Sequence, residues 1–275
     1  MGKYQHQPAA TGFDSETQRV SLLWTGGWDS TFRLLVLLLH EHRTVQPYYL
    51  IDRLDYRPSV PAEKDAMRRI RELLQDRHPM AARRLLPTIE FAVIDVPQNS
   101  EIKRHYEGCL KRGFIGGQYE WLASYCESLG IDAMELAIHR DDQARNLLEE
   151  LIDASRTKLD PRFDGDSRYE LFKSFRFPVF DKTKQQMRAE CSSGGFDEFM
   201  KLTWFCHRPR NNQPCGVCNP CIYTIKEGLG DRVPLAGRMR DHFRVMPRLR
   251  HWLTRHPDLY LAIRSYYRWL RPRAF

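Results

Sequence analysis

The sequence predicts an α/β protein in which a parallel sheet carries helices on both faces, as in Rossmann-like folds. Short apolar runs alternate with segments of helical period over the first two thirds of the chain, and this alternation is typical of parallel sheets. The 275 residues, 42% of them apolar, are enough for one large core and a small satellite. The longest apolar run, 34–39, is too short to cross a bilayer. We therefore expect a soluble protein that binds ligands at the carboxyl ends of its strands.

The predicted elements follow from the apolar pattern. The run 20–24 has the length of a buried strand, and Ala66, Ile70 and Leu74 recur at helical spacing with charges opposite. Helix and strand alternate in this way as far as Phe180. In order, we predict strand 20–24, helix 32–40, strand 46–51, helix 62–75, strand 89–96, helix 118–129, strand 133–138, helix 142–152 and a strand-like run that ends at Phe180.

Composition divides the chain into four predicted parts. Residues 1–18 are polar and unpatterned, which predicts a flexible lead-in. Residues 19–190 are predicted to form the α/β domain, residues 191–230 hold a cysteine cluster, and residues 231–275 are predicted to form a basic helical tail. The N-terminus shows no secretion signal, so we expect a cytoplasmic protein with no membrane segment.

The tail carries the whole net charge of +8. It holds eleven Arg, no Lys and three acids, so the preceding residues are neutral in sum. Leu259, Ile263 and Leu270 fall on one helical face with Arg264 and Arg268 off it. Such a tail can bind an anionic macromolecule or a protein partner; the alternative is a solvated helix that packs through its apolar face.

A glycine turn lies between the first strand and the first helix, and it reads Thr-Gly-Gly-Trp-Asp-Ser-Thr. Two glycines let the backbone approach a phosphate, and the helix that follows presents unpaired N–H groups. The alternative is a plain turn in which Ser30 caps the helix. The loop lacks the Lys of the usual phosphate loop of kinases and GTPases. The predicted nucleotide ligands in the loop are Thr25, Gly26, Gly27, Asp29, Ser30 and Thr31. Asp29 could hold Mg²⁺ or orient the loop.

Four of the seven cysteines fall within sixteen residues: Cys206, Cys215, Cys218 and Cys221. Reduced cysteines at this spacing, among Gly, Pro and Asn, predict a closed structural Zn²⁺ site. An iron–sulfur cluster uses the same ligands and stays open as an alternative. The scattered Cys109 and Cys126 are better explained as packed thiols than as nucleophiles.

Taken together, these motifs resemble one family. The loop is similar to the S-G-G-x-D-S loop of the PP-loop ATP pyrophosphatases, with Thr25 in place of Ser. The segments T-W-F-C-H at 203–207 and P-C-G-V-C-N-P-C at 214–221 resemble the zinc-binding segment of 7-cyano-7-deazaguanine (preQ0) synthases. The run F-P-V-F-D-K-T-K at 177–184 is similar to that family's T-P-L-I-D-L-T-K, and Asp55-Tyr56 to the start of its D-Y-G-Q-R.

The resemblance implies a homodimeric, zinc-containing ligase that uses ATP, Mg²⁺ and ammonia to turn 7-carboxy-7-deazaguanine into the amide and then the nitrile. It implies that Asp29, Ser30 and Lys184 act in catalysis, with Lys184 neutralising pyrophosphate, and that Asp52 contacts the nucleotide. The chain departs from the family at 137–143, where the deazaguanine-binding motif is replaced, and at 113–117, where an R-N pair is missing. The candidate substrate residues are His139, Asp141 and Asp142.

These departures leave the acceptor open. The activated carboxyl could instead be joined to a protein amine, or the enzyme could modify a tRNA base. A third possibility is a non-catalytic nucleotide-binding subunit. His139 follows a predicted strand, so it can contact substrate, act as a base or be a loop histidine. Trp24 and Trp28 can stack on a base or belong to the core.

Overall fold

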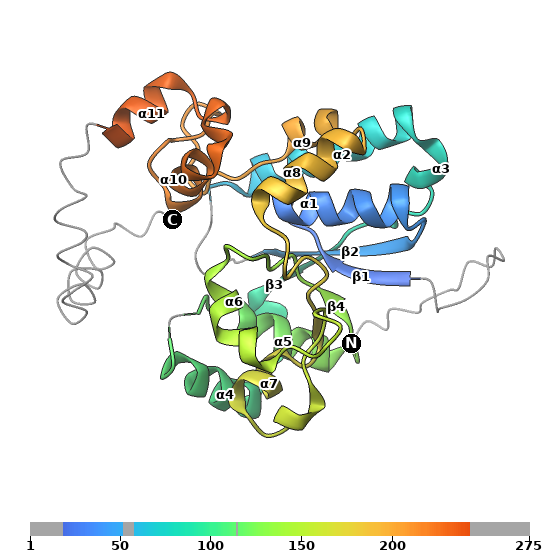
Figure 1. The fold of residues 1–275 in the computed structure, drawn as a ribbon, viewed down its shortest axis with the longest axis vertical. Coiled ribbons are helices and arrows are strands. Elements are labelled where there is room, and N and C mark those ends of the chain that lie inside the picture. Colours follow the sequence, from blue (N-terminus) through green and yellow to red (C-terminus); the bar gives the residue numbers. More distant parts are fainter. Residues whose placement is uncertain (1–18, 52–57, 114, 243–275) are drawn as a thin grey trace, which may run out of the picture. The chain divides into compact units, whose positions relative to one another are not determined.

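A computed structural model describes residues 19–51, 58–113 and 115–242. Its five-stranded parallel sheet has the order β3-β2-β1-β4-β5, which confirms the predicted Rossmann-like α/β class (Figure 1). The strands are β1 (Arg19–Leu23), β2 (Thr44–Ile51), β3 (Ile89–Ala92), β4 (Met134–Glu135) and β5 (Phe175–Arg176).

Helices cover both faces of this sheet. Helices α1, α2, α8 and α9 lie on one side, and α4, α5 and α7 lie on the other (Figure 1). The helices are α1 (Trp28–Leu35), α2 (Val60–Arg77), α3 (Pro79–Ala82), α4 (Ser100–Leu110), α5 (Gln118–Ser128), α6 (Gln143–Leu148), α7 (Ser167–Phe172), α8 (Lys184–Ser193), α9 (Asp197–Leu202), α10 (Asn219–Thr224) and α11 (Leu235–His242).

Several element bounds differ from the predicted ones. Helix α1 begins at Trp28, directly after the glycine turn, and continues as a π-helix to His40. The strand predicted over 89–96 ends at Ala92 and gives way to a 3₁₀ turn, and the strand predicted over 133–138 shrinks to Met134–Glu135. The helix predicted over 142–152 ends at Leu148 and continues as a 3₁₀ turn.

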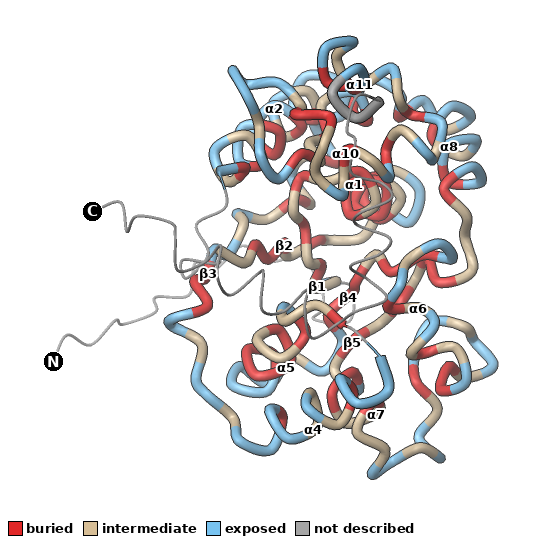
Figure 2. The backbone as a smooth tube through the Cα atoms, turned by 90° about the vertical axis from the view of Figure 1, so that its left-hand side faces the viewer, coloured by how far each residue is buried: buried red, intermediate tan, exposed pale blue. Residues whose placement is uncertain are grey.

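The core lies along the sheet and under the helices (Figure 2). Leu22 and Trp24 are fully buried at the end of β1, so Trp24 belongs to the core and cannot stack on a ligand. Phe91 of β3 stacks on Tyr125 of α5 with ring centroids 3.6 Å apart. These contacts fix α5 against the sheet and place its first turn beside the loop that follows β1.

A buried ion pair links α1 to β4. Arg33 donates two hydrogen bonds to the Glu135 carboxylate, at 2.7 and 2.9 Å, and each side chain is only 11% exposed. A buried charge that loses its partner destabilises a fold strongly, whereas exposed pairs contribute little.

We expect Glu135→Ala to lower the free energy of unfolding by about 3 kcal/mol, because Arg33 would remain buried with only the more exposed Glu41 carboxylate as its ion-pair partner. Glu72→Ala is the matched control, since Glu72 pairs with Arg68 on an exposed helix face, and it should cost less than about 1 kcal/mol. Urea denaturation measures both. Equal losses would mean that the buried pair contributes no more than a surface pair.

The chain divides into two compact units, Met1–His207 and Arg208–Phe275. In the second unit the described α-helices are α10 and α11. Gly216 packs against Gly237 so closely that a Cβ on Gly216 would lie 2.1 Å from the Gly237 carbonyl oxygen. The predicted lead-in 1–18 and the amphipathic helix around Leu259–Leu270 lie outside the described residues. The predicted boundaries at 190 and 230 stay predictions.

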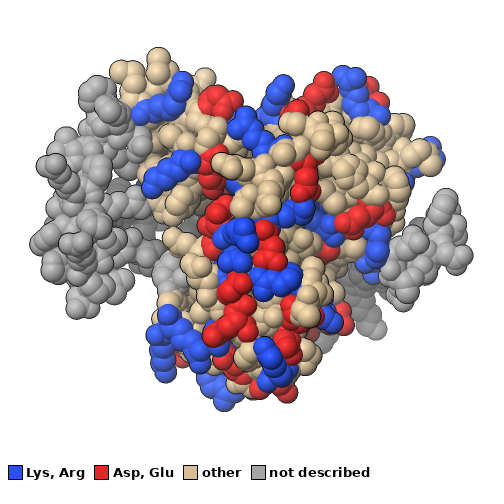
Figure 3. Space-filling view, in the orientation of Figure 1, with Lys and Arg blue, Asp and Glu red and all other residues tan. Residues whose placement is uncertain are grey.

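The described residues show the mixed surface charge and the lack of a long apolar helix that the sequence predicts. On the face shown in Figure 3, basic and acidic side chains lie beside one another, as expected for a segment with little net charge. Among the described residues, no helix is both long enough and apolar enough to span a membrane.

Candidate functional site

The loop after β1 has the backbone geometry of a close turn. Gly26 has φ +68°, and a Cβ there would lie 2.9 Å from the Glu63 carbonyl oxygen, so both conformation and space require glycine. Gly27 is the N-cap of α1, and no side chain caps this helix. The alternative in which Ser30 caps the helix is therefore wrong, and the first turn of α1 keeps its N–H groups available for an anion.

Hydrogen bonds to side-chain hydroxyls connect residues within the loop after β1. The Thr25 N–H donates to Ser30 Oγ at 3.3 Å, and the two side-chain hydroxyls lie at the same separation. Thr31 differs from expectation, because it is fully buried and its hydroxyl accepts a 3.0 Å hydrogen bond from the Trp24 indole. Thr25 and Ser30 therefore can contact a ligand, but Thr31 holds α1 to the core.

Two predicted site residues, Asp29 and Lys184, meet although they lie 155 positions apart. The Lys184 ammonium donates a short hydrogen bond to Asp29 Oδ1, and it also lies 4.9 Å from the centre of the Trp28 ring. Lys184 is the first residue of α8, which a capping box of Thr183 and Gln186 starts. The D-K-T-K motif thus brings a nearly buried cation to the N-terminus of α1.

His139 lies beside this ion pair. It is buried, and its Nε2 lies 3.8 Å from Asp29 Oδ1. Its Nδ1 accepts a 3.2 Å hydrogen bond from the Asp141 N–H, so the neutral ring carries its proton on Nε2. This tautomer suits a hydrogen-bond donor toward Asp29 or a ligand, and it disfavours the general-base role.

The adjacent acids differ in environment. Asp141 is exposed, and its carboxylate accepts from the Lys184 N–H at 3.4 Å. Asp142 caps α6 by accepting from the Ala144 N–H at 2.9 Å. Burial raises the pKa of Asp142, and the nearby Asp29 raises it further, while the Ala144 N–H, His139 and Lys184 oppose the shift.

The raised pKa of Asp142 predicts a pH-dependent cost. An acid whose folded-state pKa exceeds its unfolded value, near 3.9, destabilises the fold when ionised, and this cost disappears as the pH falls through the folded pKa. Asp142→Asn keeps a capping oxygen, so we expect it to gain about 1 kcal/mol at pH 7 and nothing near pH 4.

Asp160→Asn is the matched control for that prediction. Asp160 also caps a short helix, through the Arg162 N–H at 3.0 Å, and its carboxylate pairs with the Arg162 side chain. The Asp160→Asn variant should therefore gain no stability at pH 7. Chemical denaturation at several pH values measures both variants, and a gain for Asp142→Asn that is independent of pH would contradict the electrostatic explanation.

A cavity of about 190 Å³ opens at the loop. Loop residues line one side, and the first turn of α5 and the end of β4 line the other. The lining includes Thr25, Gly27, Trp28, Asp29, Ser30, Gln118, Tyr119, Leu122, Leu136, Ala137, Ile138 and Asp142. The sequence analysis did not predict Gln118, Tyr119 and Leu122 as site residues, because their helical pattern is the same as that of core residues. The one signal near them was the R-N pair that the resembled family has and this chain lacks at 113–117, directly before α5.

A larger cavity of about 710 Å³ lies between the residues after β3 and α5, where Lys103, Glu120 and Trp121 line it. It contains no predicted site residue. Of these two cavities, the smaller one lies where a glycine turn, an uncapped helix and opposite charges coincide, so we place the candidate site there. Asp52 and Asp55 lie outside the described residues.

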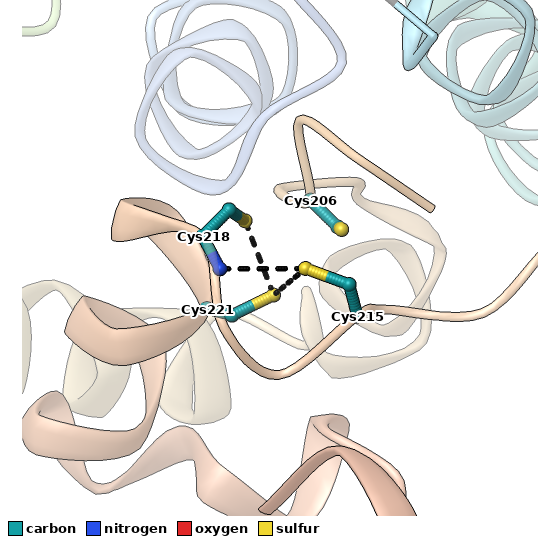
Figure 4. A group of neighbouring side chains, drawn as sticks. All are labelled: Cys206, Cys215, Cys218 and Cys221. Atoms are coloured by element: carbon teal, nitrogen blue, oxygen red, sulfur yellow. Dashed lines mark hydrogen bonds between the residues drawn. The ribbon is translucent and has the colours of Figure 1, made fainter. Parts of the chain in front are cut away.

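The four clustered cysteines come together as predicted (Figure 4). Their sulfur atoms all lie within 4.8 Å of one another, with Cys215 and Cys221 at 3.9 Å and Cys218 and Cys221 at 3.4 Å. Four thiolates around one Zn²⁺ at about 2.3 Å would be roughly 3.8 Å apart. The donor set thus fits a single tetrahedral ion.

Local structure prepares this centre. Asn211 and Asn212 both have positive φ and form the turn between Arg210 and Gln213, which returns the chain toward Cys215. The N–H groups of Val217 and Cys218 donate to Cys215 Sγ at 3.4 and 3.3 Å. Such donors stabilise a thiolate, so they support metal binding.

The other three cysteines are packed thiols. Cys109, Cys126 and Cys191 are buried, and burial raises the pKa of Cys109 to about 11 and that of Cys126 and Cys191 to about 12. A thiol with so high a pKa is a poor nucleophile at neutral pH. This agrees with the interpretation of Cys109 and Cys126 as core residues.

Comparison with models of known protein families finds no match for this chain, and comparison with curated proteins finds none either. The functional argument therefore depends on the residues of the site and on the sequence resemblance.

Proposed function

We propose that the protein is an ATP-dependent carbon–nitrogen ligase that adenylates a carboxylate and releases pyrophosphate, with 7-carboxy-7-deazaguanine as its substrate. One observation carries the ATP half of this proposal. Asp29, Lys184 and His139 converge on an uncapped helix N-terminus that follows a positive-φ glycine. This combination suits a polyphosphate and its metal ion.

In the proposed reaction, Gly26, Gly27 and Ser30 bind the β and γ phosphates. Asp29 and Asp142 line the same cavity, so they are the candidate ligands of Mg²⁺, which keeps few protein ligands besides phosphate oxygens. Lys184 neutralises the leaving pyrophosphate. With Mg²⁺ bound, Asp29 would hold the metal ion in place of its present partner, Lys184. The ion pair between the two residues keeps both groups in position beforehand.

The chemistry joins the substrate carboxylate to the α phosphate. A carboxylate oxygen forms the new bond, the bond between the α phosphorus and the bridging oxygen breaks, and pyrophosphate leaves with the electron pair. Ammonia then attacks the acyl carbon and displaces AMP, which gives the amide. A second ATP activates the amide oxygen in the same way, and loss of AMP and a proton leaves the nitrile.

The substrate half of the proposal depends on the sequence resemblance. The cavity joins the glycine turn to Gln118, Tyr119 and Asp142. A carboxylate bound among these residues would lie beside the α phosphate of a nucleotide held by the turn. The altered 137–143 segment and the Arg-rich tail favour a second candidate acceptor, an amine of a protein or a tRNA base. A non-catalytic nucleotide-binding subunit is the remaining alternative.

The test incubates the purified protein with Mg-ATP and 7-carboxy-7-deazaguanine, with and without ammonia, and follows nucleotides, small molecules and intact protein by mass spectrometry. We expect AMP and pyrophosphate, because the loop would hold the β and γ phosphates together as the leaving group. ADP and orthophosphate would contradict the assignment. Pyrophosphate without an amide, but with a mass increase on a macromolecule, would favour the second acceptor.

A further inference from the structure

The segment that ends at Cys206 contacts the nucleotide loop directly. The backbone N–H of Trp204 donates a 2.9 Å hydrogen bond to the Gly26 carbonyl oxygen. The two residues lie far apart in sequence, and both belong to the first compact unit. Nothing in the activity proposed above uses Trp204.

This hydrogen bond determines the direction of a second group. In a planar trans peptide the carbonyl of Gly26 and the N–H of Gly27 point in opposite directions. Because Trp204 holds the carbonyl on one side, the Gly27 N–H must point to the other, where it donates a 3.4 Å hydrogen bond to the Thr25 hydroxyl. This is the interior of the loop, where a phosphate would bind. Trp204 therefore orients a predicted phosphate donor.

The segment itself is held at both ends. At its start, Thr203 Oγ donates to the Met200 carbonyl at 2.7 Å, and α9 is anchored by the buried Phe199 and Met200. At its end, the Trp204 indole N–H donates to the Cys206 carbonyl at 2.8 Å. The Cys206 thiol belongs to the four-cysteine centre, so a bound ion fixes the end of the segment.

We propose that Trp204 couples the metal centre to the nucleotide loop, so that a bound ion holds the Gly26–Gly27 peptide in the orientation that binds phosphate. Trp204 is thus a positioning residue, and this inference rests on the proposed nucleotide binding. Coupling between two sites is reciprocal: the ion must tighten nucleotide binding by the same factor by which the nucleotide tightens metal binding.

The experiment measures that factor twice. The probe is the α,β-methylene analogue of ATP with Mg²⁺. Calorimetry gives its dissociation constant for the zinc-loaded protein and for protein stripped with a chelator. Competition with a chromogenic chelator gives the zinc affinity with and without the analogue. We expect both ratios to be about tenfold.

Trp204→Phe tests the route of the coupling in zinc-loaded protein. It removes the indole donor to Cys206 but keeps the backbone N–H, so the coupling factor should fall about fivefold, as for one ordinary hydrogen bond. Trp121→Phe is the matched control, since Trp121 is also half-buried but lies on α5 at the other cavity. It should leave the factor unchanged.

The outcomes separate this inference from the proposed function. Zinc-loaded wild-type protein that does not bind the analogue overturns the proposed function and this inference together. Binding that is independent of zinc overturns only the coupling. An equal loss in Trp204→Phe and Trp121→Phe overturns the role of Trp204. If the stripped protein unfolds, zinc competition on the folded, loaded protein still gives the coupling factor.

Discussion

Asp29→Ala should lower the rate of pyrophosphate formation at least about 100-fold, the effect typical of losing one group that stabilises developing charge in an active site. Asp29 contacts the Lys184 ammonium and lies near His139. Its removal deprives Mg²⁺ of a ligand and leaves both neighbours without their carboxylate. Because the Asp29 side chain is 30% exposed, the variant should still fold. A pyrophosphate-coupled assay measures the rate, and circular dichroism measures whether the fold is kept.

Two lysines of one motif supply the matched control. Lys184→Ala should cause a comparable loss, because it removes the cation at the loop. Lys182 lies two positions earlier, where its ammonium pairs with Glu190 and not with the loop. Lys182→Ala should therefore keep most of the activity. If both lysine variants lose activity equally, the motif acts through its general structure and not through the Lys184–Asp29 contact.

The sequence predicted the fold well wherever apolar residues define an element. Strand β1 and helices α1, α2 and α5 lie near their predicted positions, because each carries several buried apolar side chains. Helix α4 was not predicted, since only Ile102 and Cys109 of its eleven residues are buried. Its start depends on a local contact, the Asn99 side chain accepting from two backbone N–H groups. Periodicity is a weak signal for such a helix.

The strand before His139 shows a different limit. Residues 133–138 have the pattern of a strand, yet only Met134 and Glu135 pair within the sheet. The Leu136 N–H still donates to the Arg176 carbonyl at 2.9 Å, after which the chain leaves the sheet toward the cavity. Residues that line a site and residues that fill a sheet can share one apolar pattern, so composition alone cannot locate the end of the strand.

Some features of the candidate site could be predicted from the sequence and others could not. The glycine turn and the cysteine spacing are local patterns, so sequence could find them. The contact between Asp29 and Lys184 spans 155 positions, and only the family resemblance indicated it. The hydrogen bond from Trp204 to Gly26 uses backbone atoms, which leave no residue-type signal. Such a contact is set by the three-dimensional fold and not by residue type.

Metal binding gives the second large expected effect. Purified protein should contain one zinc per chain, because thiolates this close would repel one another without a cation. Cys218→Ser should lose the metal and destabilise the chain, since it removes a thiolate whose sulfur lies 3.4 Å from Cys221 Sγ. Zinc binding contributes about 10–16 kcal/mol in small zinc peptides, so even a partial loss should shift thermal unfolding clearly.

Cys191→Ser is the matched control for that variant, because Cys191 is buried but lies outside the cluster. It should keep its zinc, although burying a hydroxyl in place of a thiol can cost some stability. Elemental analysis separates the two variants even if both unfold at lower temperature. Protein prepared without oxygen that holds iron and no zinc would contradict the zinc assignment. Retention of zinc by Cys218→Ser would instead mean that three thiolates suffice, and that the centre has an exchangeable fourth position where a structural site should be closed.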